Sequence, residues 1–118
     1  MEDIEWSQKG VYYVADCWVN GSELDVWFDA NANWIMTEME IFREQLPAAV
    51  NTAYEESGYG DWVIDNLTKL TFPHKSEEFV FEVQRGAQER ALYYSAYGGL
   101  LLEKDITDAD DTHWPDVE

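Results

Sequence analysis

The sequence predicts an α+β domain in which one antiparallel sheet, made of two repeated hairpin units, carries a single helix on one face. Three observations lead to this fold. Two stretches alternate apolar and polar residues around a two-residue sequence typical of a hairpin turn. These two stretches align with each other at a fixed offset, and a third stretch has apolar residues at helical spacing. The 118 residues match the size of one domain, and 46% hydrophobic residues with six Trp are enough for one core.

Each hairpin is predicted from a two-residue turn between strand-like runs. Asn20-Gly21 favours a type I′ turn, because both residues tolerate positive φ, and Gly86-Ala87 suits a type II′ turn with glycine first. Such turns fix the register and therefore the set of side chains that share a face. The face expected to form the core carries Tyr13, Ala15, Cys17, Val19, Ser22, Leu24, Val26 and Phe28 in the first hairpin, and Phe79, Phe81, Leu92 and Tyr94 in the second.

The two hairpins correspond in sequence. Residues 13–28 align without a gap with residues 79–94 at an offset of 66, and the offset extends to residues 34–36 and 100–102. A third strand is expected in each unit, at Trp34–Thr37 and Leu100–Lys104. We therefore predict one domain over residues 1–106, with half-repeats at about 1–41 and 46–106, followed by an acidic tail at 107–118.

The helix is expected between the two units. Its apolar positions recur at helical spacing, with Pro47 near the start and Gly58 at the end, and a strand from Trp62 to Phe72 follows and ends at Pro73. These positions are Leu46, Ala49, Val50, Ala53 and Tyr54. The same offset places the first unit's counterpart helix before residue 1. We therefore expect an upstream segment or a neighbouring chain to cover the first unit's apolar face.

The charge of the chain excludes some partners. Twenty-five acidic residues against seven basic ones give a net charge of −18, which repels nucleic acid and anionic membranes. Two explanations of this charge stay open: it keeps a Trp-rich protein soluble, or it steers a basic partner. The sequence has no apolar run long enough to span a membrane.

The sequence predicts neither catalysis, a cofactor nor a metal site. Cys17 is expected in the core, while His74 in a turn and His113 in the tail have no companions at ligand spacing. The tail carboxylates, Asp105, Asp108, Asp110 and Asp111, are expected to be solvated.

One segment resembles a calcium loop. Asp29-x-Asn31-x-Asn33 with Glu40 in the twelfth position copies the oxygen spacing of an EF-hand, but Trp34 stands where that loop needs glycine. Strand-like residues flank the segment where helices would be required. Calcium binding is therefore the least favoured alternative.

The opposite face of the sheet is the candidate binding surface. Large aromatic rings alternate there with carboxylates, a composition typical of protein interfaces. The site residues we predict on this open face are Asp16, Trp18, Asp25, Trp27 and Tyr93. We expect a non-enzymatic module that binds another protein through this face. The alternative is a structural protein whose sheet face pairs with a second copy, giving a dimer.

Several segments carry a resemblance to a known family. They are D-I-E-W at 3–6, Y-Y-V-A-D at 12–16, V-W-F-D-A-N-A-N-W at 26–34, T-E-M-E-I at 37–41 and L-P-A-A-V at 46–50. Over nearly residues 2–106 the chain resembles the PepSY-like, beta-lactamase-inhibitor-like proteins of Bacteroidetes. The resemblance implies a sheet with helices on one face, a periplasmic or otherwise exported location, and a protein-binding or inhibitory role. Two departures from the family pattern are noted: the leader and first helix that the resemblance leads us to expect are not among residues 1–118, and Ala32 and Asn33 stand where the family usually has glycine before Trp34.

Overall fold

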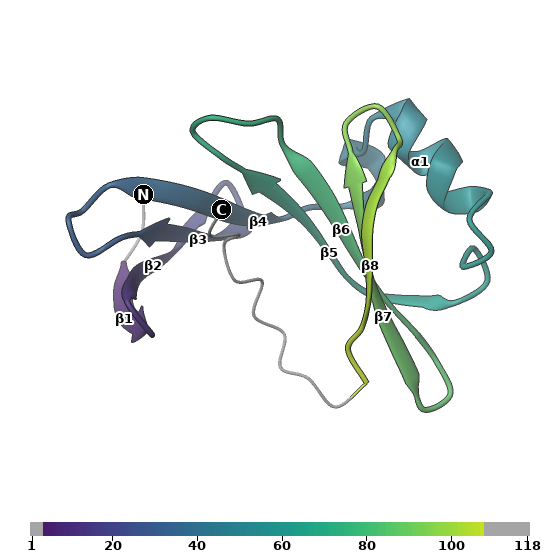
Figure 1. Ribbon diagram of the computed structural model, residues 1–118, viewed down its shortest axis with the longest axis horizontal. Helices are drawn as coiled ribbons and strands as arrows, with labels where there is room; N and C mark the ends of the chain where they lie inside the picture. The colour runs from purple at the N-terminus through teal and green to yellow at the C-terminus, as the bar shows by residue number, and fades with distance from the viewer. Residues whose placement is uncertain (1–3, 108–118) are drawn as a thin grey trace.

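The computed structural model describes residues 4–107, which form one antiparallel sheet and one α-helix (Figure 1). The eight strands are hydrogen-bonded in their chain order, and every neighbouring pair is antiparallel. They are β1 (Glu5–Lys9), β2 (Tyr12–Val19), β3 (Ser22–Phe28), β4 (Trp34–Glu40), β5 (Val63–Thr71), β6 (Glu78–Arg85), β7 (Gln88–Ser95) and β8 (Leu100–Asp105). A 3₁₀ turn (Arg43–Gln45) and helix α1 (Ala48–Glu55) lie between β4 and β5. The prediction of an antiparallel sheet with one helix is confirmed.

Both predicted turns set the register as expected. Asn20 and Gly21 have φ of 54° and 81°, the positive values that a type I′ turn needs, while Gly86, first in its turn, has φ of 61°. In the first hairpin Cys17 lies opposite Leu24, and the remaining pairs also match. The predicted pairs of the second hairpin, Phe79 with Tyr94 and Phe81 with Leu92, are also present.

Helix α1 begins later than predicted. Leu46 and Pro47 are extended, with ψ of 143° and 145°, because a residue before proline avoids the helical region and Pro47 occupies the N-cap. The chain leaves the helix through Gly58, whose φ is +90°. A helix of eight residues is too short to be stable alone, so it depends on the burial of Val50 and Tyr54 against the sheet.

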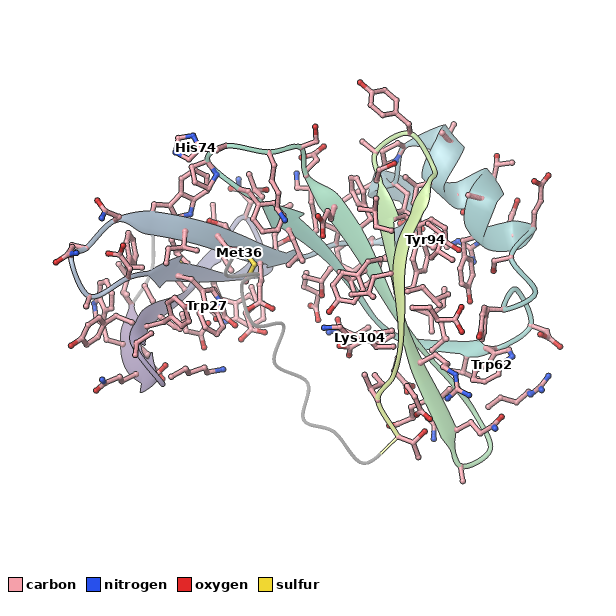
Figure 2. All side chains as sticks on the ribbon, in the orientation of Figure 1. Trp27, Met36, Trp62, His74, Tyr94 and Lys104 are labelled. Atoms are coloured by element: carbon pink, nitrogen blue, oxygen red, sulfur yellow. The ribbon has the colours of Figure 1, made fainter. Side chains whose placement is uncertain are left out.

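The face under α1, called here the helix face, contains the first core. The Tyr54 ring stacks on Phe81 with centroids 4.3 Å apart, and Phe81 meets Tyr94 edge-on at 5.6 Å. Figure 2 places Tyr94 on the side of β8 where α1 lies. The buried members of this core are Ile41, Val50, Tyr54, Trp62, Leu67, Phe79, Phe81, Val83, Leu92 and Tyr94. The predicted core face is thus correct in the second hairpin.

The opposite face, called here the concave face, is not open as predicted. It contains a second core, whose buried members are Val14, Trp27, Met36, Leu70, Val80, Ala91 and Tyr93. Residues of β4 and β8 line one cavity of about 240 Å³ on this face, although in a flat sheet these strands would be roughly 19 Å apart. The sheet must therefore curl, and Figure 1 shows its two halves at a steep angle. This curvature buries the side chains that alternation alone assigned to an open surface.

The helix face of the first half is only partly covered. Helix α1 packs on the second half, so Trp6 is 63% exposed and Tyr13 and Trp34 are also exposed, while Val26 and Phe28 are half-buried. Ala15 and Cys17 are nevertheless buried. The predicted core face of the first hairpin is therefore correct at its centre and wrong at Tyr13 and Val19, which are exposed, because residues 4–107 contain no second α-helix to cover this face.

We predict that Cys17 resists thiol reagents in the native protein. Its side chain is 4% exposed and lies beside Leu24, so a reagent reaches the sulfur only when the hairpin opens. Labelling with a chromogenic disulfide should be slow in buffer and fast in denaturant. Labelling at the same rate in both conditions would contradict the assigned register.

We predict opposite effects from two reciprocal glycine–alanine substitutions. Ala32 and Gly98 occupy equivalent positions in the β3–β4 and β7–β8 loops, with φ of 65° and 88°. Ala32→Gly should stabilise by about 0.5–1 kcal/mol, because the positive φ costs alanine more than glycine. Gly98→Ala should destabilise by about 2–3 kcal/mol, since its Cβ would lie 2.6 Å from the Ala49 carbonyl oxygen.

Denaturant unfolding of both variants beside the wild type measures the two effects. A stabilised Gly98→Ala variant would mean that α1 does not approach the β7–β8 loop as closely as the structure places it.

Candidate functional site

Carboxylates crowd together on the concave face of the first half. The Asn20-Gly21 turn places Asp16 directly opposite Asp25, and Asp25 also lies opposite Glu38 on β4. Carboxylate oxygens of Asp16, Glu23 and Asp25 all lie within 4.8 Å of one another. Together with Trp18, which pairs with Glu23, these residues form what we call the acidic patch: Asp16, Trp18, Glu23, Asp25 and Glu38.

The charges of the acidic patch repel one another. Burial, together with repulsion from Asp16 and Glu38, raises the pKa of Asp25 to about 6. The pKa of Glu23 is also raised, by burial first and then by the charge of Asp16. Asp25 therefore carries a proton at pH values at which an ordinary aspartate is ionised.

The fold leaves this cluster without an internal cation. Among residues 4–107, no Lys, Arg or His nitrogen lies within 4.0 Å of a carboxylate oxygen of Asp16, Glu23 or Asp25. Oδ1 of Asp16 is buried and accepts no hydrogen bond. A buried acceptor without a donor costs about 1–3 kcal/mol. A cation that reached this point could contact all three carboxylates.

Trp27 lies beside the acidic patch on the same face of β3 and donates a hydrogen bond to one of its carboxylates. The indole Nε1 of Trp27 donates to a carboxylate oxygen of Glu38 at 2.7 Å. Tyr12 packs edge-on against the Trp27 ring at 5.7 Å, and Lys9 lies 5.6 Å above it. These contacts fix the position of Glu38 beside Asp25.

The structure separates the predicted site residues into two groups. Asp16, Trp18 and Asp25 lie together in the first hairpin, and Trp18 is 50% exposed. Trp27 is fully buried and Tyr93 is 8% exposed in the second half, so neither presents its ring to a partner. The expectation that these two rings are exposed on an open face is wrong, because the curled sheet encloses both in the second core.

Two members of the patch, Glu23 and Glu38, are absent from the predicted site residues, and Glu38 also lies outside the predicted strand. The predicted third strand ends at Thr37, whereas β4 continues to Glu40. The alternation of M-T-E-M-E over residues 36–40 carries the signal for the longer strand.

The calcium-like segment is a hairpin loop between β3 and β4. Oδ1 of Asp29 accepts from the backbone N–H groups of Asn31 and Asn33 at 2.8 and 2.9 Å, and the Asn33 amide donates to Oδ2 at 3.1 Å. Strands flank the loop on both sides, so it has no EF-hand architecture.

The remaining ionisable candidates lie outside the patch. His74 is exposed in the β5–β6 turn, pointing outward in Figure 2. His113, Asp108, Asp110 and Asp111 lie outside the described residues. Asp105 pairs with Arg90 at 3.1 Å.

Comparison with known proteins identifies the family. Residues 11–102 match the family described as "Putative beta-lactamase-inhibitor-like, PepSY-like". The chain belongs to this family. No curated protein matches the chain.

Solved structures of similar proteins come from Bacteroides species. A BLIP-like protein of Bacteroides fragilis is 55% identical with a TM-score of 0.90, over 98% of this chain and 83% of that one. A protein of Bacteroides eggerthii named as a putative periplasmic protein is 32% identical with a TM-score of 0.88, over 92% and 80%. A DUF2874 family protein of Bacteroides ovatus is 30% identical with a TM-score of 0.90, over 93% and 80%.

The family match confirms the resemblance seen in the sequence segments. The description of the family is inhibitor-like, and the first of the similar structures is called BLIP-like. Within residues 4–107, the structure has no helix with the length and apolar character needed to cross a membrane.

We predict that Asp25→Asn stabilises the protein near pH 7.5 but not near pH 4. Because the pKa of Asp25 is higher in the folded state than its ordinary value of 3.8, folding favours the protonated form. Its contribution to stability is therefore largest below about pH 4 and is lost as the pH rises through about 6. Removing the charge should gain about 1 kcal/mol at pH 7.5, a figure reduced for solvent screening.

The matched control is Asp29→Asn, which removes the same charge from the β3–β4 loop. Hydrogen bonds from Asn33 lower the pKa of Asp29, so this variant should lose stability at neutral pH. Thermal melts at low salt compare both variants with the wild type. A loss of stability in Asp25→Asn would mean that its carboxylate is already satisfied within the fold.

Proposed function

We propose that this protein is a non-enzymatic, inhibitor-like binding module that contacts a basic segment of another protein through the acidic patch. The observation that carries the proposal is the group of three carboxylates within 4.8 Å of one another that has no internal cation. Repulsion among these carboxylates lowers the stability of the folded protein. Their presence is explained if they bind a cationic group of a partner.

The chemistry of the patch favours a Lys or Arg side chain of the partner. An entering cation would remove the repulsion that raises the pKa of Asp25 and could donate to Oδ1 of Asp16. Trp18, half-exposed beside Glu23, adds apolar contact area next to the charges. The net charge of −18 would speed encounter with a basic partner.

The relatives support an inhibitory role and an exported location. The family is described as beta-lactamase-inhibitor-like, and one related structure is of a protein named as a putative periplasmic protein. We propose the same compartment for this chain, where a small acidic module could meet secreted enzymes.

A two-unit organisation is part of the proposal. Irregularities in strand pairing at Trp27/Phe28 and Tyr93/Tyr94 are 66 residues apart. The loops after them share a hydrogen-bond pattern, in which Asp29 and Ser95 donate from the backbone to the residue four positions on. Asp25, however, corresponds to Ala91, so the opposed carboxylate pair belongs to the first unit alone. The acidic patch is therefore not a feature that both repeat units share.

The proposal predicts charge-dependent capture of a partner. Tagged wild-type protein, incubated with a native periplasmic extract, should retain a basic protein at 50 mM salt and release it at 300 mM. The double variant Asp16→Asn/Asp25→Asn should retain about tenfold less. Asp29→Asn, which removes a carboxylate outside the patch, should behave like the wild type.

Three results would count against the proposal. Equal capture by the double variant would remove the patch from the contact. Concentration-dependent dimerisation of the free protein in sedimentation would favour the alternative, a self-associating structural protein. Binding of Ca²⁺ to the patch at micromolar concentration, measured by calorimetry, would assign the carboxylates to a metal instead. A kinetic assay with a purified periplasmic beta-lactamase tests the inhibitory role directly.

A further inference from the structure

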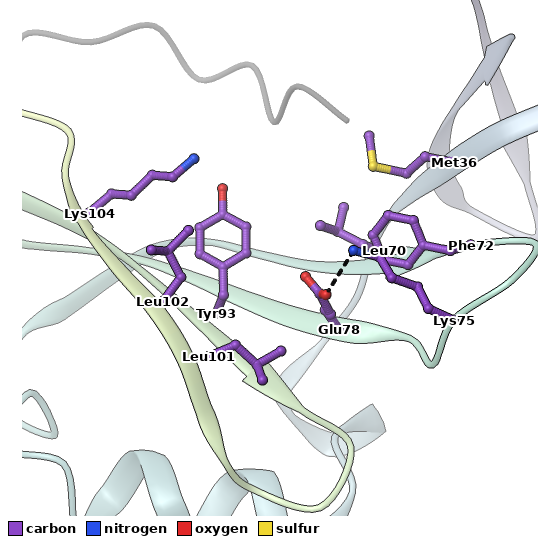
Figure 3. Close-up of a pocket in the computed structure, with 9 residues that line it drawn as sticks. All are labelled: Met36, Leu70, Phe72, Lys75, Glu78, Tyr93, Leu101, Leu102 and Lys104. Atoms are coloured by element: carbon purple, nitrogen blue, oxygen red, sulfur yellow. Dashed lines mark ion pairs between the residues drawn. The ribbon is translucent and has the colours of Figure 1, made fainter. Parts of the chain in front are cut away.

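We propose a second binding site on the concave face, which takes an apolar side chain flanked by a carboxylate from a partner protein. The site is the cavity of about 240 Å³ described above, which we call the lysine pocket (Figure 3). It lies between β4 and β8, and its lining is Met36, Leu70, Phe72, Lys75, Glu78, Tyr93, Leu101, Leu102 and Lys104.

The floor of the lysine pocket is formed by buried, largely apolar side chains. Met36, Leu70 and Tyr93 belong to the buried core of the concave face. Leu101 and Leu102 form an exposed apolar rim on β8. Exposed leucines beside an apolar floor leave a surface that gains free energy when an apolar group covers it.

Two lysines give the pocket a charge opposite to that of the protein. The chain has seven basic residues, and Lys75 and Lys104 both line this one cavity. In Figure 3 they lie at its two ends, with Tyr93 and Leu70 between them. Lys75 pairs with Glu78 at 3.5 Å.

Lys104 has no such carboxylate partner. Its Nζ lies 5.2 Å from the centre of the Tyr93 ring, and no carboxylate oxygen lies within 4.0 Å of it among the described residues. It is therefore available to an anion that arrives with the occupant.

Size and charge together select the occupant. Pockets for small organic ligands usually exceed about 300 Å³, so a cavity of about 240 Å³ suits one large side chain. The lysine at the rim favours a negative charge next to that side chain. A protein segment with an apolar residue followed by Glu or Asp meets both conditions. This site does not depend on the acidic patch, which lies on β2, β3 and β4 and has the opposite charge.

Two capped dipeptides test the site. The ¹⁵N-labelled protein is titrated with N-acetyl-Phe-Glu-amide and with the neutral N-acetyl-Phe-Gln-amide, while amide shifts are recorded. We expect shifts at the amides of residues lining the pocket and about fivefold tighter binding of the Glu peptide, the upper range for a solvent-exposed ion pair. In Lys104→Gln the two peptides should bind equally.

Matched variants separate charge from structure. Arg85→Gln removes the same charge from a residue that stacks on Trp62, away from the pocket, and should keep the fivefold preference. Leu102→Ser should weaken both peptides alike, because it removes rim contact without changing the charge. A dispersed amide spectrum establishes that each variant is folded.

Two outcomes would overturn the proposal. One is equal affinity of the two peptides for the wild type, or a preference that survives Lys104→Gln. The other is binding of hexanoate at least as tightly as the Glu peptide, which would make the pocket a site for small carboxylic acids. Neither outcome bears on the acidic patch, whose test uses other residues and another partner.

Discussion

The burial of Trp27 is the constraint on which the rest of the molecule depends. One short helix can cover only half of one face of an eight-stranded sheet, so most of the remaining apolar area has to be buried by the sheet itself. The curl of the sheet does this by bringing side chains from β2 to β7 together around Trp27 and Met36, which lie beside each other in Figure 2. Truncating a tryptophan in such a position costs about 3–5 kcal/mol.

The same indole contacts the acidic patch beside it. A buried N–H requires an acceptor, and Glu38 provides one at 2.7 Å. The pairing of β3 with β4 places Glu38 opposite Asp25, whose other neighbour across the strands is Asp16, and the indole bond fixes the Glu38 carboxylate there. The raised pKa of Asp25 thus follows from the packing of the core as well as from the turn that set the register. Core and candidate site are parts of one arrangement.

This dependence explains what the sequence could and could not predict. The turn at Asn20-Gly21 is local, so the pairing of Asp16 with Asp25 followed from residue chemistry alone. Alternation assigns side chains to a face, but it does not say whether that face curls onto itself. That depends on contacts between distant strands, and for this reason the burial of Trp27 and Tyr93 was missed. Helix α1 begins at Ala48 because Pro47 is its N-cap, whereas the apolar periodicity alone extends the helix back to Leu46.

Curvature also explains why one concave face could hold two sites of opposite charge. The core of Trp27, Met36 and Val80 separates the acidic patch on β2–β4 from the lysine pocket between β4 and β8. A partner that used both would have to present a basic group and an apolar–acidic pair at a fixed separation. Opposite charges at two points fix orientation more strongly than one patch of either sign, and they reject partners in the reversed orientation. A uniformly acidic surface could attract basic proteins, but it could not orient them.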